Sequence, residues 1–170
     1  MDPADLRGLP TLTVLPPWGS SIARWGKPWE NRPMPPPRSI RGRPLAIHQG
    51  LLALTTRGQI RATAAGQRLA RDLATVAERV GLSEAAVLDQ LREDEGRVLC
   101  LVVVMVWARL APWLASPMLI SMGGGQTPVE LDPWMHRDPE RETYAWGLHD
   151  LSVVDGAPRV RGQQGIWRMP

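Results

Sequence analysis

The chain is poor in cysteine and carries no pattern of metal-binding residues. Its one cysteine, Cys100, excludes a disulfide within the chain and a cysteine-based metal site. Because Cys100 lies in an apolar run, we expect a buried thiol that acts as a small hydrophobic side chain. His136 and His149 have no partner at the spacing of metal ligands. We therefore predict no metal and no cofactor.

Phenylalanine is absent and tyrosine occurs once, whereas tryptophan occurs eight times. Tryptophan must therefore supply nearly all of the aromatic core. We assign Trp107, Trp113 and Trp167 to that core. Any other single tryptophan is also more often a core residue than a platform for a ligand.

Long hydrophobic runs are missing too. The longest, Val98 to Ala108, is far shorter than the roughly 20 residues of a membrane helix. The N-terminus carries acidic residues and prolines where a signal peptide has basic and apolar segments. Hydrophobic residues make up 44% of the 170 residues and charged residues 22%, as in ordinary globular proteins. We predict a cytoplasmic protein without a membrane partner, with an N-terminal tail over 1–10 and a single domain over 11–170.

Lysine is nearly absent. The formal net charge is +3, and Lys27 is the only lysine among twenty basic residues. This charge is compatible with nucleic acid but does not require it. An ammonium group is compact and can lose its proton when buried, whereas a guanidinium stays charged. A lysine kept in an arginine-rich chain therefore suggests a chemical role for Lys27.

The first third of the chain alternates apolar segments with proline and glycine. β-Branched and apolar runs predict strands, and glycine after a short polar segment predicts the end of a helix. The residue before a proline is disfavoured in a helix, so the chain before Pro33 should be extended. In order, we predict a strand at 11–15, a helix at 18–25, an extended segment at 28–32, an exposed proline loop at 33–37 and a strand at 44–48.

Residues 66–95 have the apolar spacing of two helices, with Gly81 ending the first and Ser83 capping the second. A helix-turn-helix that reads DNA has a similar spacing. Here, however, the second helix offers mainly acidic side chains, which repel DNA, so DNA is disfavoured as a partner. We favour a helical hairpin inserted into a sheet.

The last part of the chain predicts three more strands and a long loop. We expect a buried strand at 97–110, a loop at 121–142 that is a candidate pocket wall, and strands at 144–154 and 161–168. Short strands with one helical excursion predict an α+β fold in which a mixed β-barrel carries flanking helices and the inserted hairpin.

The most informative stretch runs from Leu15 to Gly50. Its successive features are a proline-tryptophan pair, a helix, a GK..E.R motif, an Arg-Gly pair and a strand that ends in Ile-His. The end of the chain adds a tryptophan strand and a closing Gly-Ile-Trp. Together these features resemble the ASCH domain family over roughly half of the chain. The matching residues are Pro17, Trp18, Gly26, Lys27, Glu30, Arg32, Arg41, Gly42, Ile47, His48, Trp146, Leu148, Asp150, Gly162, Gly165, Ile166 and Trp167.

This resemblance implies a PUA-like β-barrel with a charged cleft between the barrel and its first helix. ASCH members bind RNA or take part in coactivator complexes. Some small bacterial members hydrolyse the amide of N4-acetylcytidine, and one is a ribonuclease. In the amidohydrolase-like members the motif lysine matches Lys27, and a threonine three residues later is the nucleophile. Glu30 holds that place here and cannot act as a nucleophilic hydroxyl.

Lys27, Glu30 and Arg32 are the main candidates for a site. In an extended segment residues 30 and 32 share a face, and Lys27 comes from the turn before them. A carboxylate between two cations stays ionised and leaves the cations to hold a phosphate or a base edge. The alternative is an internal salt-bridge network that fixes the junction of helix and strand. The resemblance to ASCH domains favours the site.

Three further residues are candidates, each with a structural alternative. Trp18 either stacks on a base or packs in the core. Arg41, in a basic loop, either contacts phosphates or is solvated. His48 is either a pocket residue or a hydrogen-bonded histidine at the end of an apolar strand.

Three functions follow from these residues. The first is a nucleic-acid-binding module that recognises RNA or a modified nucleobase around Lys27, Glu30 and Arg32. The second is a hydrolase acting on modified nucleosides or RNA, with Lys27 as base and Glu30 as an acid/base or orienting group. The third is a protein-interaction module that uses the proline loop and the acidic hairpin.

Overall fold

The computed structural model describes residues 3–170, which divide into two compact units. The first comprises the described residues up to Gly26, Ala46–Cys100 and Val153–Pro170, and the second comprises Lys27–Leu45 and Leu101–Ser152. Both units are built from segments that are distant in sequence, so no single linker separates them. The number of folding domains stays a prediction.

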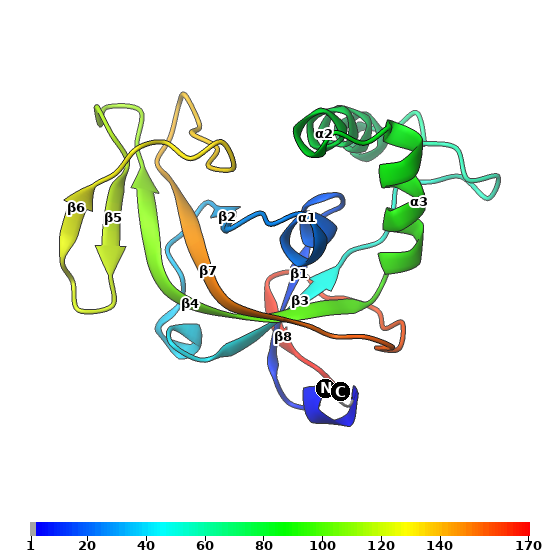
Figure 1. Ribbon diagram of the computed structural model, residues 1–170, viewed down its shortest axis with the longest axis horizontal. Coiled ribbons are helices and arrows are strands. Elements are labelled where there is room, and N and C mark those ends of the chain that lie inside the picture. The colour runs from blue at the N-terminus through cyan, green and yellow to red at the C-terminus, as the bar shows by residue number, and fades with distance from the viewer. Residues whose placement is uncertain (1–2) are drawn as a thin grey trace. The chain divides into compact units, whose positions relative to one another are not determined.

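The first unit is a small sheet with three helices (Figure 1). Strand β1 lies between β3, to which it is parallel, and β8, to which it is antiparallel. The elements of the first unit are the 3-10 helix η1 (Pro3–Leu6), β1 (Pro10–Val14), α1 (Trp18–Arg24), most of β3 (Pro44–Gln49), α2 (Ala64–Val80), α3 (Glu84–Asp94), the start of β4 (Val98–Leu110) and β8 (Ile166–Arg168).

The segment at residues 8–9 pairs with the C-terminal segment in this unit. The backbone N–H of Gly8 donates to the carbonyl of Met169 (3.0 Å), and Met169 N–H donates to the carbonyl of Leu9 (3.2 Å). The side chain of Leu6 is fully buried. The segment expected to be a plain tail thus contains a turn of 3-10 helix that packs into the core.

Helices α2 and α3 form the predicted hairpin, drawn in green in Figure 1. Ser83 Oγ accepts from the N–H of Ala86 at 3.2 Å and caps α3. Gly81 ends α2 in the left-handed conformation (φ 71°), where its N–H reaches the last carbonyls of the helix. The helical periodicity is confirmed, because most apolar positions of both helices are buried (Leu69, Leu73, Val76, Val87 and Leu91), while Val80 and Leu88 are half-buried.

The second unit is built around β7 (Thr143–Val153), which lies between β2 (Trp29–Arg32) and β4. On the far side of β4, β5 (Met118–Ser121) pairs antiparallel with β4 and with β6 (Gln126–Pro128). A 3-10 helix, η2 (Arg38–Ile40), precedes β3. The core contains Trp29 packed against Ala108, Leu110, Met135 and Ala145.

Gly147 of β7 makes room for this core. A Cβ atom there would lie 2.7 Å from Val106 Cγ2 and 3.0 Å from Trp29 Cζ3, both closer than van der Waals contact. A side chain at this position would therefore push Trp29 away from the sheet. The glycine allows β2 and β7 to pair at the observed register.

The mixed α+β class is confirmed, whereas a PUA-like barrel is not, since neither unit is a closed barrel within residues 3–170. Most of the predicted strands and all three helices lie within a few residues of their expected places. In the described part of the chain, no helix combines the length and the apolar character needed to cross a bilayer.

Three expectations are wrong in detail. Residues 121–142 include strand β6, because Gln126–Pro128 pairs with β5 in a hairpin whose polar sequence gives no strand signal. The last strand covers only Ile166–Arg168, since the segment before it is rich in glycine and glutamine and stays irregular. Trp113 was placed in the core but is 66% exposed, because it lies in a turn after β4 where strand alternation has ended.

Gly81 gives a test of the hairpin. Gly81→Ala should lower the free energy of unfolding by about 1–2 kcal/mol, because alanine disfavours positive φ while nothing within 4 Å of the position would clash. Gly81→Asn should cost less, since asparagine tolerates this conformation. Urea unfolding measures both, with Gly123→Ala in an exposed turn as the control. Equal losses in the alanine and asparagine variants would contradict the αL cap.

Candidate functional site

The GK..E.R motif spans the turn into β2 and the strand itself. β2 pairs antiparallel with β7, with Glu30 opposite Trp146 and Arg32 opposite Tyr144. Alternate residues of a strand point to opposite faces. Trp29 therefore enters the core of the unit, while Glu30 and Arg32 share the other face, as predicted.

Lys27, Glu30 and Arg32 form a linked ion cluster. Lys27 Nζ lies 3.1 Å from Glu30 Oε2, and Arg32 Nε lies 3.0 Å from Glu30 Oε1. Lys27 Nζ also donates to the carbonyl oxygen of Trp29. Each carboxylate oxygen of Glu30 thus has one cation, and the cluster carries a net charge of +1.

Exposure differs sharply within the cluster. The side chains of Lys27 and Glu30 are 2% and 7% exposed, whereas Arg32 is 24% exposed. Removing ions from water costs several kcal/mol each, and their mutual attraction offsets this only with good geometry and further hydrogen bonds. The cluster is therefore an enclosed charge pair with one cation that reaches the surface.

Trp146 flanks the exposed member of the cluster. The guanidinium carbon of Arg32 lies 6.0 Å from the ring centroid of Trp146, a cation–π distance. The ring is 4% exposed, and its Nε1–H donates to the carbonyl of Met34 at 2.9 Å. Arg32 is thus oriented on one side by Glu30 and on another by an aromatic face.

Arg41 has partners of its own in the same unit. Its Nε donates to the carbonyl of Pro36 at 2.8 Å, and its guanidinium lies 4.2 Å from the ring centroid of Trp107. Trp107 is only 6% exposed. Arg41 is half-buried, so it fixes the proline loop to the sheet while part of it still faces solvent.

Asn31 clamps the long loop predicted as a pocket wall. Its Nδ2 donates to the carbonyl of Trp134 at 2.8 Å, and its Oδ1 accepts from the N–H of His136 at 2.9 Å. Asn31 stands between Glu30 and Arg32 in the strand and points to the opposite face. The same short strand therefore anchors the ion cluster and the loop.

Trp18 and His48 lie in the first unit. The half-buried Trp18 donates from Nε1 to Asp72 Oδ2 at 3.2 Å. His48 is 1% exposed, with Nδ1 3.3 Å from Thr13 Oγ1 and Nε2 3.1 Å from the carbonyl of Val160. Its ring also meets Trp167 edge-on at 5.7 Å. The contacts of His48 match its alternative as a hydrogen-bonded histidine at the end of an apolar strand, whereas the half-buried Trp18 is not a fully buried core residue.

The sequence interpretation missed two residues around β2, one beside the cluster and one on the opposite face of the strand. Trp146 belongs to the family pattern, but the sequence indicates no role for it, because its pairing with Glu30 is visible only across the strands. Asn31 gave no signal, since a single asparagine in a strand is uninformative. Among residues 3–170, no three histidine, cysteine, aspartate or glutamate side chains are grouped to hold a metal ion.

No protein-family model matches the sequence, and no curated protein matches it significantly. The resemblance to ASCH domains therefore depends on the motif residues of the sequence alone. Of those, Lys27, Glu30 and Arg32 contact one another directly.

His48 gives a test of pH dependence. Its pKa is lowered by burial, which outweighs the raising effect of the hydrogen bonds to the backbone of Val160 and Gly96. As the pH falls below the ordinary value of about 6.5, the unfolded chain takes up a proton before the folded chain does. The contribution of the neutral His48 ring to the free energy of unfolding is therefore fully present above that pH. Below that pH the contribution falls by up to about 1.4 kcal/mol per pH unit.

Urea unfolding between pH 7.5 and 5.5 measures this loss. The native protein should lose stability more steeply than His48→Gln, whereas His149→Gln, which changes an exposed histidine, should keep the native slope. Parallel curves for the native protein and His48→Gln would contradict the buried neutral imidazole.

Proposed function

We propose that this protein is a nucleic-acid-binding module that recognises RNA or a modified nucleobase at the Lys27–Glu30–Arg32 cluster. The observation that carries the proposal is a buried lysine–glutamate pair that ends in a partly exposed arginine beside a tryptophan. Arg32 is the member that meets the ligand, and Lys27 and Glu30 are positioning residues.

The cost of burying charge supports a binding role. Replacing a buried ion pair by apolar residues is often neutral or stabilising, so stability alone is a weak reason to keep one. A fixed guanidinium has a use, because it presents paired donors to a phosphate or to the O6 and N7 atoms of a guanine. Glu30 holds Arg32 in one orientation before the ligand arrives, which lowers the entropy lost on binding.

The surroundings of Arg32 suit a nucleic acid. Arg32 presents a partly exposed cation that is held beside a buried indole, and such a cation can bind a phosphate or the edge of a base. Arg41 adds a second half-exposed guanidinium in the same unit. With these partners, the protein is expected to act in the cytoplasm, where RNA and nucleotides are present.

The fold that we propose for this function is the PUA-like barrel of ASCH domains. Its support is the parallel pairing of β1 with β3, the antiparallel pairing of β2 with β7, and the placement of the motif at the turn into β2. The motif residues occupy this turn and strand in the order of the family pattern.

Fluorescence anisotropy with a short single-stranded RNA tests the proposal. Arg32→Gln should weaken binding about tenfold or more, because a charge-assisted hydrogen bond contributes roughly 1.5–3 kcal/mol. Arg32→Gln should also reduce the slope of log affinity against log salt concentration by about one, because one fewer counterion is released on binding. Arg71→Gln, which removes an exposed arginine on α2, is the matched control and should leave the affinity within twofold.

Lys27→Ala is the second variant, and it should also weaken binding while circular dichroism shows that the fold is kept. If Lys27→Ala unfolds the chain, the Arg32→Gln variant, which changes the partly exposed member of the cluster, still tests the proposed site. Native affinity in Arg32→Gln would contradict the proposed site. An absence of binding by the native protein would contradict RNA recognition altogether.

A hydrolase is the second candidate, because Lys27 Nζ and Glu30 Oε2 are 3.1 Å apart. A lysine and a carboxylate in contact can exchange a proton and could act as base and acid on the amide of a modified nucleoside. Turnover of N4-acetylcytidine, followed by chromatography, should then fall about 100-fold or more in Glu30→Gln. If the native protein forms no cytidine, this candidate fails and the binding proposal is unaffected.

A further inference from the structure

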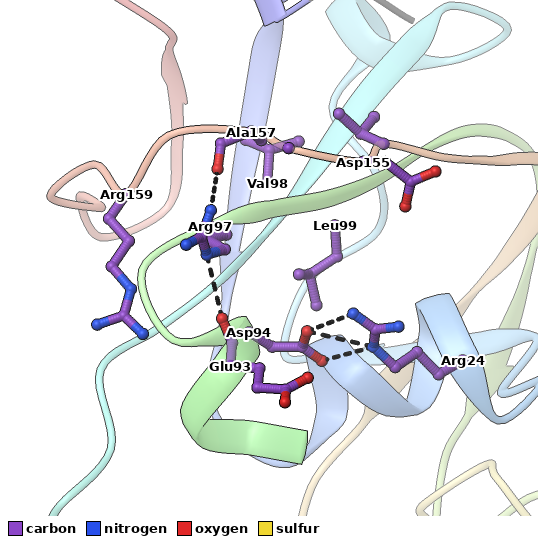
Figure 2. A pocket seen from close by; sticks show the side chains of 11 residues that line it. Arg24, Glu93, Asp94, Arg97, Val98, Leu99, Asp155, Ala157 and Arg159 are labelled. Carbon is purple, nitrogen blue, oxygen red and sulfur yellow. Dashed lines mark hydrogen bonds and ion pairs between the residues drawn. The ribbon is translucent and has the colours of Figure 1, made fainter. Parts of the chain in front are cut away.

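The first unit contains a pocket that shares no residue with the Lys27 cluster (Figure 2). Its volume is about 360 Å³, within the usual range for pockets that bind small molecules. Buried apolar side chains, among them Leu99 and Val154, form part of its wall. The rest of the lining is mostly charged: Arg24, Glu93, Asp94, Arg97, Asp155 and Arg159.

Carboxylates gather around Arg24 at one side of the pocket. Arg24 Nη2 lies 2.6 Å from Asp94 Oδ1, and Arg24 Nε lies 2.9 Å from Asp94 Oδ2. Asp94 is 1% exposed and also accepts from Ser20 Oγ at 2.7 Å. The pKa of Arg24 is raised by its hydrogen bonds to Asp94 and, further, by the charges of Glu93 and Asp155. One guanidinium therefore stands among three carboxylates, an excess of two negative charges.

Two arginines stand at the other side, as Figure 2 shows. Arg97 donates from Nε to the carbonyl of Glu93 at 3.1 Å and from Nη1 to that of Ala157 at 2.5 Å. Arg159 donates from Nη2 to the carbonyl of Arg92 at 2.8 Å. These partners are neutral carbonyl groups. Within the described residues, no carboxylate pairs with Arg97 or Arg159, so this side keeps an excess of two positive charges.

We propose that this pocket binds a small zwitterion of dipeptide size. The ammonium group of the ligand lies near Asp155 and Glu93, its carboxylate lies on Arg97 and Arg159, and an apolar side chain lies over Leu99 and Val154. Guanidinium groups bind carboxylates with paired, charge-assisted hydrogen bonds. A bare anion fits less well, because two carboxylates of the lining would repel it, and like charges in contact cost several kcal/mol.

Isothermal titration calorimetry on the full chain tests this inference with leucylalanine and glycylglycine as probes. Leucylalanine should bind more tightly, because its leucine side chain covers the apolar wall. N-acetyl-leucylalanine and leucylalanine amide each lack one charge and should bind about tenfold more weakly or worse.

Each variant removes one charge, either from the carboxylate side or from the arginine side of the pocket. Asp155→Asn and Arg159→Gln should each weaken leucylalanine at least tenfold, and both side chains are exposed, so the fold should be kept. Glu130→Gln and Arg57→Gln remove the same charges at exposed positions elsewhere and should change nothing.

Several results would overturn the inference. One is no heat of binding with either dipeptide, and another is equal binding of the blocked analogues. A third is binding of inorganic phosphate that Arg159→Gln abolishes and Asp155→Asn leaves intact, which would make the pocket a simple anion site. RNA binding in the anisotropy assay is measured separately, so failure here leaves the proposed function standing.

Discussion

The carboxylate of Glu30 lies almost out of solvent, and an ionised carboxylate in that position requires positive charge beside it. Lys27 and Arg32 supply that charge, one at each oxygen. Glu30 and Arg32 share one face of β2, so the register of β2 on β7 decides what this cluster faces. A slip of one residue would turn Glu30 toward the apolar core and bring Trp29 out of it. The strand therefore has one acceptable position, in which Asn31 also reaches the loop around Trp134.

Two arginine–tryptophan pairs in the same unit attach the proline loop, residues 33–37, to the sheet. Proline has no N–H group, so residues 33–37 can join a sheet mainly through their carbonyl oxygens. Trp146 donates to the carbonyl of Met34, and Arg41 donates to that of Pro36. Each donor also belongs to a cation–π pair, Arg32 with Trp146 and Arg41 with Trp107. In a chain without phenylalanine, tryptophan thus provides the aromatic surface of both pairs and the hydrogen-bond donor of one of them.

The features that depend on neighbouring residues in the sequence were predictable. The features that depend on contacts between distant segments were not. The hairpin of α2 and α3 was predictable, because helical spacing, the Ser83 cap and Gly81 are all local signals. The contact of Lys27, Glu30 and Arg32 was predictable for the same reason, since the three lie within six residues. Strand β6 is visible only through its pairing with β5, and Trp146 joins the site only through the β2–β7 register. The pocket of the first unit draws residues from three distant segments, so no local pattern marks it.

Lys27 differs from the arginines discussed above in how far its side chain is enclosed. Lys27 is 2% exposed, and its ammonium directs donors to the carbonyl of Trp29 and to Glu30 within a single turn of chain. A guanidinium is larger and planar and has five N–H donors, which an enclosed site would have to satisfy. Arg32, Arg41, Arg97 and Arg159 lie where some donors reach solvent, so they do not face that demand. The one lysine in the chain therefore occupies an enclosed position, where its compact ammonium has a carbonyl and a carboxylate as partners.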